Sequence, residues 1–351
     1  MPNLKSITVL AVASLACTLP AHSQALLYRL ESTTALPSTD TGWDYIKMEP
    51  GSSRLYLARD KDALTVVDVD TLKVVKTVVN SEGANGPLLL PQYGRGYVAM
   101  TDGSLLSFGL DTLEPIARLP LSKTGGLNSG IHDPASSRVH FIEGTRASES
   151  TWFTLDAATG KLLGSKTFPF RKMDDPALDG KGRLFAPVRY DDLVMVLDSK
   201  TLQEKARWNV GCHVAKVNYQ ASTRRLLAAC GGDKPQFLAI DPADGRIVSR
   251  LPIGPGLDGF VVDQKRRRIV TSNGADGTLT VIGQQGPDDY ALLGTVSTRI
   301  GARMMTLDPR DGRLLVVNAD YTLGPVQADG SQLRTYHPDS FVVLTYRPDD
   351  P

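Results

Sequence analysis

The chain has 351 residues, of which 41% are hydrophobic and 7% aromatic, with 39 Lys and Arg residues against 38 Asp and Glu residues. This is the composition of an ordinary globular protein, and it excludes disordered, collagen-like and polytopic membrane proteins. The balanced charge creates no overall field that would attract nucleic acid or an anionic membrane, so partners must be recognised locally. The length exceeds that of one ordinary compact core, so we expect two domains or one repeat architecture.

The N-terminus has the pattern of a cleaved secretory signal. Lys5 precedes the apolar stretch Ile7–Leu19, and small residues follow up to Ala25. The apolar stretch is shorter than the ~20 residues that a membrane-spanning helix needs. We therefore predict a signal peptide over residues 1–25, a periplasmic location and no transmembrane segment.

The three cysteines divide into one near the N-terminus and a pair in the second half of the chain. Cys17 would leave with the signal peptide, and a lipid anchor there is less favoured because Ser14 stands where such sites usually carry Leu. Cys212 and Cys230 are predicted to form a disulfide in an oxidising compartment. A catalytic thiol or a metal pair are the alternatives, but the spacing matches no zinc signature.

A segment of four short strands recurs along the chain. Its second strand opens, in most copies with a basic residue, at intervals of 42 to 45 residues, and no stretch has helical periodicity. A regular period of this length is typical of a β-propeller, and seven copies predict seven blades of four antiparallel strands. The second strands open at Arg54, Gly96, Arg138, Arg183, Arg225, Arg268 and Arg313.

The two ends of the chain complement each other. The last copy stops after a third strand, Phe341–Tyr346, whereas a spare strand-like stretch, Leu27–Leu36, stands near the start. We expect this stretch to supply the missing outer strand of the last blade, because the ring then has no open seam. Residues 26–351 are thus predicted to form a single all-β, seven-bladed propeller domain.

Two segments carry a resemblance to a known repeat. Phe185 to Asp198 and Val270 to Ile282 combine a short strand, a loop rich in Asn, Gly and Asp, and a Val-rich strand. They resemble the YVTN-type β-propeller repeat, although the tetrapeptide itself is absent. The resemblance implies an exported bacterial propeller, and it implies a fold more strongly than any particular activity.

A ring of polar residues is expected at one end of the central channel. The first strand of each blade lines this channel, and the loops before it share one face with the loops between second and third strands. We predict a ligand-binding pocket on that face, although such residues can also cap backbone groups. The aligned residues are Asp44, Asn85, Asn128, Asp174, His213, Asp258 and Arg303, and the adjoining loops add Arg189 and Tyr321.

Some of these residues suggest specific chemistry. His213 is the best candidate for a general base or metal ligand, although a structural histidine is the commoner case. Arg189 and Arg303 could clamp a carboxylate or phosphate, or could neutralise Asp174 and Asp258 across the channel. The loop from Asn318 to Ser340 is far longer than its counterparts, so a lid or binding loop is expected there.

Three functions are compared. The absence of any recognised catalytic motif favours a non-catalytic, monomeric binding protein that takes a small ligand, a peptide or a protein partner, with no cofactor and no metal. The alternative is a lactonase- or lyase-type enzyme, with His213 as base, Asp44 or Asp258 orienting it and Arg303 stabilising the developing anion. Binding of single-stranded nucleic acid is not favoured, because it needs a positive groove with exposed aromatic residues.

Overall fold

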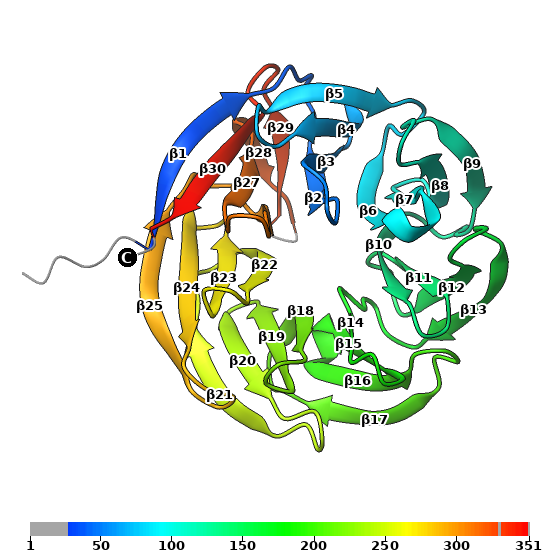
Figure 1. Ribbon diagram of the computed structural model, residues 1–351, viewed down its shortest axis with the longest axis vertical. Helices are drawn as coiled ribbons and strands as arrows, with labels where there is room; N and C mark the ends of the chain where they lie inside the picture. Colours follow the sequence, from blue (N-terminus) through cyan, green and yellow to red (C-terminus); the bar gives the residue numbers. More distant parts are fainter. Residues whose placement is uncertain (1–26, 329–330, 350–351) are drawn as a thin grey trace, which may run out of the picture.

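The structure is a computed structural model that describes residues 27–328 and 331–349, so the predicted signal peptide lies outside the described residues. Within them the chain forms seven four-stranded antiparallel sheets in a ring, together with one two-stranded sheet (Figure 1). The helical elements in this part of the chain are two single turns, η1 (Pro91–Tyr93) and η2 (Arg189–Asp191). No helix of the described residues has the length and apolar character needed to cross a membrane. The predicted seven-bladed β-propeller is confirmed.

Each blade is built outward from the channel. The β7 strand begins at Arg95 rather than at the predicted Gly96, so an arginine stands at or directly before the start of every second strand. The first strands are β2 (Trp43–Met48), β6 (Ala84–Leu90), β10 (Leu127–Asp133), β14 (Ala177–Leu178), β18 (His213–Gln220), β22 (Leu257–Asp263) and β26 (Met304–Leu307). The second strands are β3 (Arg54–Arg59), β7 (Arg95–Met100), β11 (Arg138–Glu143), β15 (Arg183–Val188), β19 (Arg225–Gly231), β23 (Arg268–Asn273) and β27 (Leu314–Asn318). The third strands are β4 (Ala63–Asp68), β8 (Ser104–Gly109), β12 (Ser150–Asp156), β16 (Leu193–Asp198), β20 (Gln236–Ile240), β24 (Thr278–Gln284) and β30 (Val342–Pro348). The fourth strands are β5 (Lys73–Val78), β9 (Pro115–Pro120), β13 (Leu162–Phe168), β17 (Glu204–Asn209), β21 (Ile247–Pro252), β25 (Tyr290–Ser297) and β1 (Tyr28–Ala35).

The ring closes through the N-terminal strand. The last blade has the strand order β1-β30-β27-β26, and β1 runs antiparallel to β30 from the Tyr28–Pro348 pair to the Ala35–Val342 pair. In Figure 1 these two strands lie side by side at the upper left of the ring, one blue and one red. The predicted closure is confirmed, and it leaves the edge of β30 covered.

The hydrophobic core lies between the blades. Seven clusters of buried side chains each combine residues of two neighbouring blades. Leu55 of β3, for example, packs in one cluster with Leu315 of β27, whereas its neighbour Tyr56 packs in the next cluster with Phe108 of β8. Because both faces of the sheets are covered, the second strands read as nearly continuous apolar runs rather than alternating ones.

In six of the seven blades, the arginine at the start of the second strand contacts the following blade. Arg225 Nε lies 2.6 Å from Asp288 Oδ1 in the following blade. Arg313 Nη2 in turn donates to Asp70 Oδ1 of the first blade over 2.7 Å. The repeated basic residue is therefore explained by contacts between blades.

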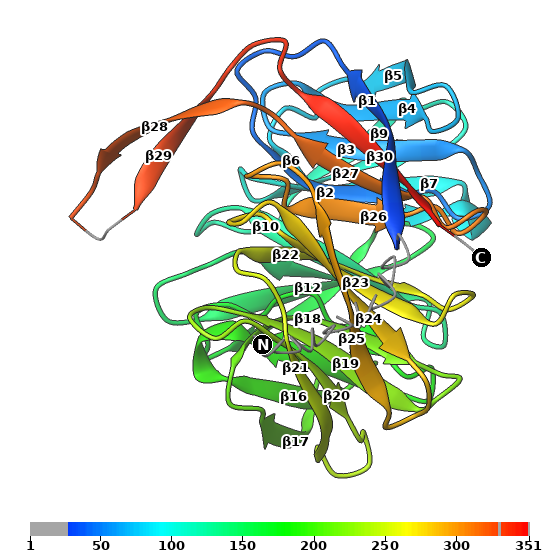
Figure 2. The same ribbon diagram turned by 90° about the vertical axis from the view of Figure 1, so that its left-hand side faces the viewer.

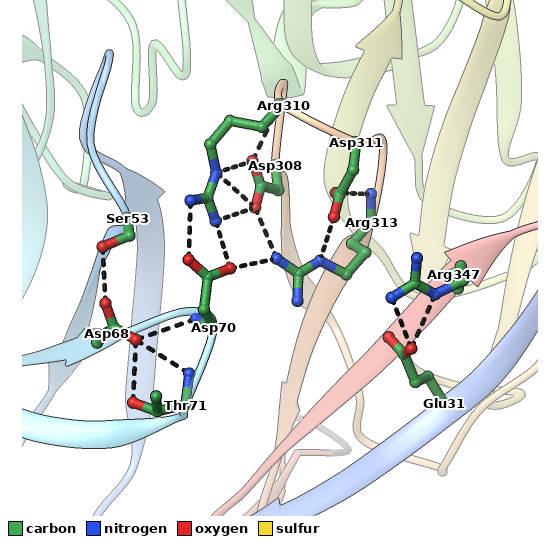
Figure 3. Close-up of polar contacts among 10 residues, drawn as sticks. All are labelled: Glu31, Ser53, Asp68, Asp70, Thr71, Asp308, Arg310, Asp311, Arg313 and Arg347. Atoms are coloured by element: carbon green, nitrogen blue, oxygen red, sulfur yellow. Dashed lines mark hydrogen bonds and ion pairs between the residues drawn. The ribbon is translucent and has the colours of Figure 1, made fainter.

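The contact between the last and first blades is a network of charges (Figure 3). Arg310 donates to both oxygens of Asp70, at 2.9 and 2.8 Å. Both Arg310 and Arg313 also donate to Asp308, whose side chain is completely buried. Because these hydrogen bonds carry full charges and share a buried acceptor, they are stronger than isolated surface pairs.

The two faces of the ring differ. The loop between β27 and β30 forms a two-stranded arm, β28 (Tyr321–Val326) and β29 (Gln332–Tyr336), that projects from one face (Figure 2). The first strands begin on this face, which we call the arm face. The opposite face carries the turns between first and second strands, and we call it the turn face. The predicted long loop Asn318–Ser340 is therefore mostly an ordered hairpin.

Candidate functional site

A register shift in the first strands brings polar side chains to the channel. In β2 the pairing with β3 jumps from Trp43–Arg59 to Ile46–Leu57, which leaves Asp44 and Tyr45 inside a bulge. Such bulges bend a strand and redirect side chains, and they recur in four of the other six first strands, β6, β10, β18 and β22. The residues at the Asp44 position around the ring are Asp44, Asn85, Asn128, Asp174, Ala215, Asp258 and Arg303.

Six of these seven residues are the ones predicted for the ring. The exception is Ala215, since His213 is predicted at that position. Ala215 occupies the position in β18, because the pairing with β19 shifts between Val214 and Lys216. His213 instead lies at the start of the strand, with 46% of its side chain exposed and its Nε2 3.7 Å from Asp192 Oδ1. It lines a cavity of about 210 Å³ outside the channel. The candidate base is thus beside the ring rather than in it.

Asp44, Asp258 and Arg303 form the acidic side of the channel mouth. Arg303 Nε lies 3.7 Å from Asp258 Oδ2, and Arg303 Nη2 donates to the backbone oxygen of Trp43 over 2.7 Å. The guanidinium also lies over the Trp43 ring, 5.6 Å from its centroid. One arginine therefore faces two carboxylates.

The shared arginine does not neutralise both carboxylates. Burial raises the pKa of Asp44 to about 7, and the nearby charge of Asp258 adds to this effect, whereas Arg303 opposes it. Among residues 27–328 and 331–349, none forms a hydrogen bond or ion pair with the Asp44 carboxylate. At neutral pH, Asp44 is consequently close to the midpoint of its titration.

Asp174, Arg189 and Lys172 form the basic side of the channel mouth. Arg189 Nε lies 2.6 Å from Asp174 Oδ2, and Lys172 Nζ lies 3.4 Å from Asp174 Oδ1. Asn128 Nδ2 lies 3.3 Å from the same Oδ1 and donates to it. Burial still raises the pKa of Asp174 above its ordinary value, although both cations lower it. We call the acidic and basic sides together the mouth cluster.

A second layer of side chains crosses the channel beneath the mouth cluster. Tyr45 of β2 donates its hydroxyl proton to Asp175 Oδ1 over 2.8 Å, and Lys216 Nζ of β18 lies 2.6 Å from Asp175 Oδ2. The Lys216 ammonium also lies 4.5 Å from the centroid of the Tyr45 ring. These three residues come from the first, fourth and fifth blades, so they bridge the channel. We call them the plug.

The plug determines the ionisation of its own carboxylate. Burial alone would raise the pKa of Asp175, but Lys216, Lys47 and the hydrogen bond from Tyr45 outweigh it and hold the pKa at about 2. Sequence analysis missed all three plug residues. Ala215 stands ten residues before Arg225, the same spacing that separates Asp44, Asn85, Asn128, Asp258 and Arg303 from their second-strand arginines. This spacing would have located the ring position at Ala215, with Lys216 directly after it.

The arm is anchored next to the mouth cluster. The Tyr336 ring packs on Trp43 with 5.1 Å between centroids, and Tyr321 contacts Tyr336 at 6.0 Å. Trp43 in turn lies under Arg303. Tyr321 is therefore connected to the mouth cluster through two aromatic contacts, and it does not line the ring itself.

The disulfide lies on the arm face. Cys212 and Cys230 are bonded, as predicted, and the bond joins the start of β18 to β19 beside His213. The described part of the chain contains no group of three or more His, Cys, Asp or Glu side chains arranged to hold a metal ion.

Comparisons with known proteins support the fold. No family model and no curated protein matches the chain. Among solved structures, a chain of the "Crystal Structure of Mitotic Checkpoint Complex" is similar with a TM-score of 0.72 and 10% sequence identity, over 99% of both chains. At this identity the likeness shows the fold alone, since the same fold serves many unrelated functions. The chain is thus similar in architecture to a chain of this complex.

Proposed function

We propose that this protein is an exported propeller that binds a small ligand, or a segment of a peptide or protein, at the mouth cluster without catalysing a reaction. The proposal depends on one observation, the division of the mouth cluster into two sides of opposite charge. Asp44 and Asp258 share one arginine, whereas Arg189 and Lys172 share Asp174. A ligand that carries both a cation and an anion would complement the two sides.

The exported location has separate support. The sequence pattern of residues 1–25 suits a secretory signal, and the Cys212–Cys230 disulfide suits an oxidising compartment such as a periplasm. The resemblance to YVTN-type repeats agrees with this location. The solved neighbour belongs to a protein complex, a use of the fold that agrees with a peptide or protein partner.

The experiment is a thermal-shift screen of the mature chain with short blocked peptides. One series carries one lysine and one aspartate at varied spacing, and matched series carry lysine only, aspartate only or neither. A ligand at ~100 times its dissociation constant adds about 2.7 kcal/mol to native stability, which is easily detected. We expect the mixed-charge peptides to give the largest shift.

Two variants separate the mouth cluster from the rest of the surface. Asp258→Asn should abolish the shift, because it removes the carboxylate that lies opposite Arg303 on the acidic side. Asp40→Asn is the control, since Asp40 pairs with Lys61 in an exposed position. Equal shifts for lysine-only and mixed peptides, or an unchanged shift in Asp258→Asn, would contradict the proposal.

An enzymatic function has one supporting observation, and it concerns Asp44 rather than His213. A carboxyl with a pKa of about 7 beside an arginine suits a general base that acts next to an anion-stabilising group. Lactone hydrolysis that is lost in Asp44→Asn and kept in His213→Ala would favour this function over simple binding.

A further inference from the structure

The turn-face end of the channel holds a cavity that is separate from the mouth cluster. Its volume is about 740 Å³, within the usual range for small-molecule sites. The plug residues Asp175 and Lys216 lie at its inner end, and Pro50 and Gln92, in turns on the turn face, lie at its outer end. Its wall also includes Lys47 of β2, Leu88 of β6, Ile131 and His132 of β10, Asn218 of β18 and Phe260 of β22.

The cavity lining holds two lysines, Lys47 and Lys216, and one carboxylate, Asp175. Lys216 is neutralised by Asp175 at 2.6 Å. Lys47 has no ion pair and donates no hydrogen bond to any residue in the described ranges, although its ammonium lies 5.6 Å from the centroid of the Tyr45 ring. Its side chain is nevertheless accessible within the cavity. Burial lowers the pKa of Lys47, Asp175 opposes this effect and Lys216 adds to it, and a bound anion would restore the lost stabilisation of the charge.

The remaining polar groups are neutral. Burial lowers the pKa of His132, so this imidazole is uncharged at neutral pH. Its Nδ1 lies 3.4 Å from Gln92 Nε2. The Asn218 carboxamide is exposed to the cavity and can donate a hydrogen bond. With Asp175 and Lys216 compensating each other, the net charge of the lining is that of a single lysine.

The rest of the wall is apolar. Leu88, Ile131 and Phe260 come from three different blades and are partly accessible within the cavity. Each offers apolar surface that a bound molecule would remove from water. A single cation next to such a wall suits a molecule with one anionic group and a hydrocarbon body, whereas a phosphate dianion would lack its second positive partner.

We propose that this cavity binds a small organic monoanion, a carboxylate with an apolar body. The carboxylate lies against the Lys47 ammonium and the Asn218 amide, and the body lies against Leu88, Ile131 and Phe260. This site is independent of the mouth cluster, because the plug lies between them.

The test is calorimetric titration of the full chain with octanoate, and with octanamide as its uncharged counterpart. Octanoate should bind with one-to-one stoichiometry and at least tenfold more tightly than octanamide. Shortening the chain to hexanoate and butanoate should weaken binding by roughly fourfold for each methylene removed, because each buried methylene contributes about that factor.

Variants identify the residue that holds the anion. Lys47→Gln should weaken octanoate binding at least tenfold, whereas Lys47→Arg, which keeps the charge, should restore most of it. Lys61→Gln is the matched control, because Lys61 pairs with Asp40 on the surface and does not line the cavity. Thermal melts of each variant confirm that it is folded.

Three results would overturn the proposal. They are equal affinities for octanoate and octanamide, unchanged octanoate affinity in folded Lys47→Gln, and no binding of octanoate at millimolar concentration. Asp258→Asn should leave octanoate binding unchanged, so the outcome does not depend on the function proposed for the mouth cluster.

Discussion

Asp44 is a carboxylate whose ionisation destabilises the folded protein. Its pKa is about 7 in the folded protein against an ordinary value of 3.8, because it is buried near Asp258 and shares Arg303 with it. Between these two values the folded protein binds more protons than the unfolded chain. The contribution of this group therefore destabilises the fold progressively as the pH rises from about 4 to about 7, and remains constant above that.

The variant Asp44→Asn should remove this pH dependence. We expect no gain in the free energy of unfolding at pH 4, and a gain at pH 8 of up to about 4 kcal/mol, which corresponds to some three units of pKa. Urea unfolding at a series of pH values measures it. Asp40→Asn, at an exposed and paired carboxylate, should show no such gain. A parallel pH profile for wild type and Asp44→Asn would exclude this account.

Buried and exposed charges at the seam should differ sharply in their effect. Asp308 is completely buried and accepts hydrogen bonds from both Arg310 and Arg313, so Asp308→Ala removes the buried acceptor that these two cations share. We expect a loss of about 3 kcal/mol in the free energy of unfolding. Glu31→Ala, which removes the exposed partner of Arg347 in the same region, should cost less than about 1 kcal/mol (Figure 3). Chemical denaturation of the two variants compares them directly.

Among the elements, the β18–β19 pair has a covalent link. The Cys212–Cys230 bond joins residues that are 18 apart in sequence. Closing a loop of this size restricts the unfolded chain and so raises the free energy of the unfolded state by about 3 kcal/mol. Reduction should therefore lower the thermal midpoint of the wild type. The double variant Cys212→Ser, Cys230→Ser should have the lowered midpoint with or without reductant. A wild-type midpoint that does not respond after complete reduction would show that the bond contributes little.

The elements were more predictable than the site. Every blade buries the same faces and six of the seven repeat the same arginine contact, so the period and the number of blades could be predicted from the sequence. The position of His213 could not be predicted from the start of its strand, because the bulge in β18 shifts the ring position to Ala215. The plug was beyond local patterns, since Tyr45 and Asp175 are far apart in sequence and meet only because the ring brings opposite blades within reach.

At the scale of the whole molecule, ring closure depends on β1. Removing residues 27–36 would uncover the edge of β30 and delete Tyr28, which is buried in the cluster between the last two blades. We expect the shortened protein to lose its cooperative thermal transition and to associate through the open edge. A synthetic peptide of residues 27–36 should restore a monomer with a cooperative transition. Size-exclusion chromatography and calorimetry measure both, and a shortened chain that stays monomeric with an unchanged midpoint would contradict the prediction.

The pairing of β1 with β30 also determines when the ring can close during synthesis of the chain. A ribosome makes β1 before the other six blades and β30 after them, so the first strand waits for its partner until all six have been made. The six blades from β2 to β25 use only strands that are close in sequence, and each can form soon after its own residues emerge. The last blade alone must bring together segments more than three hundred residues apart, a slow step because of the chain entropy it removes. The synthesis of β30, rather than the formation of any single earlier blade, therefore sets the moment at which the ring can close.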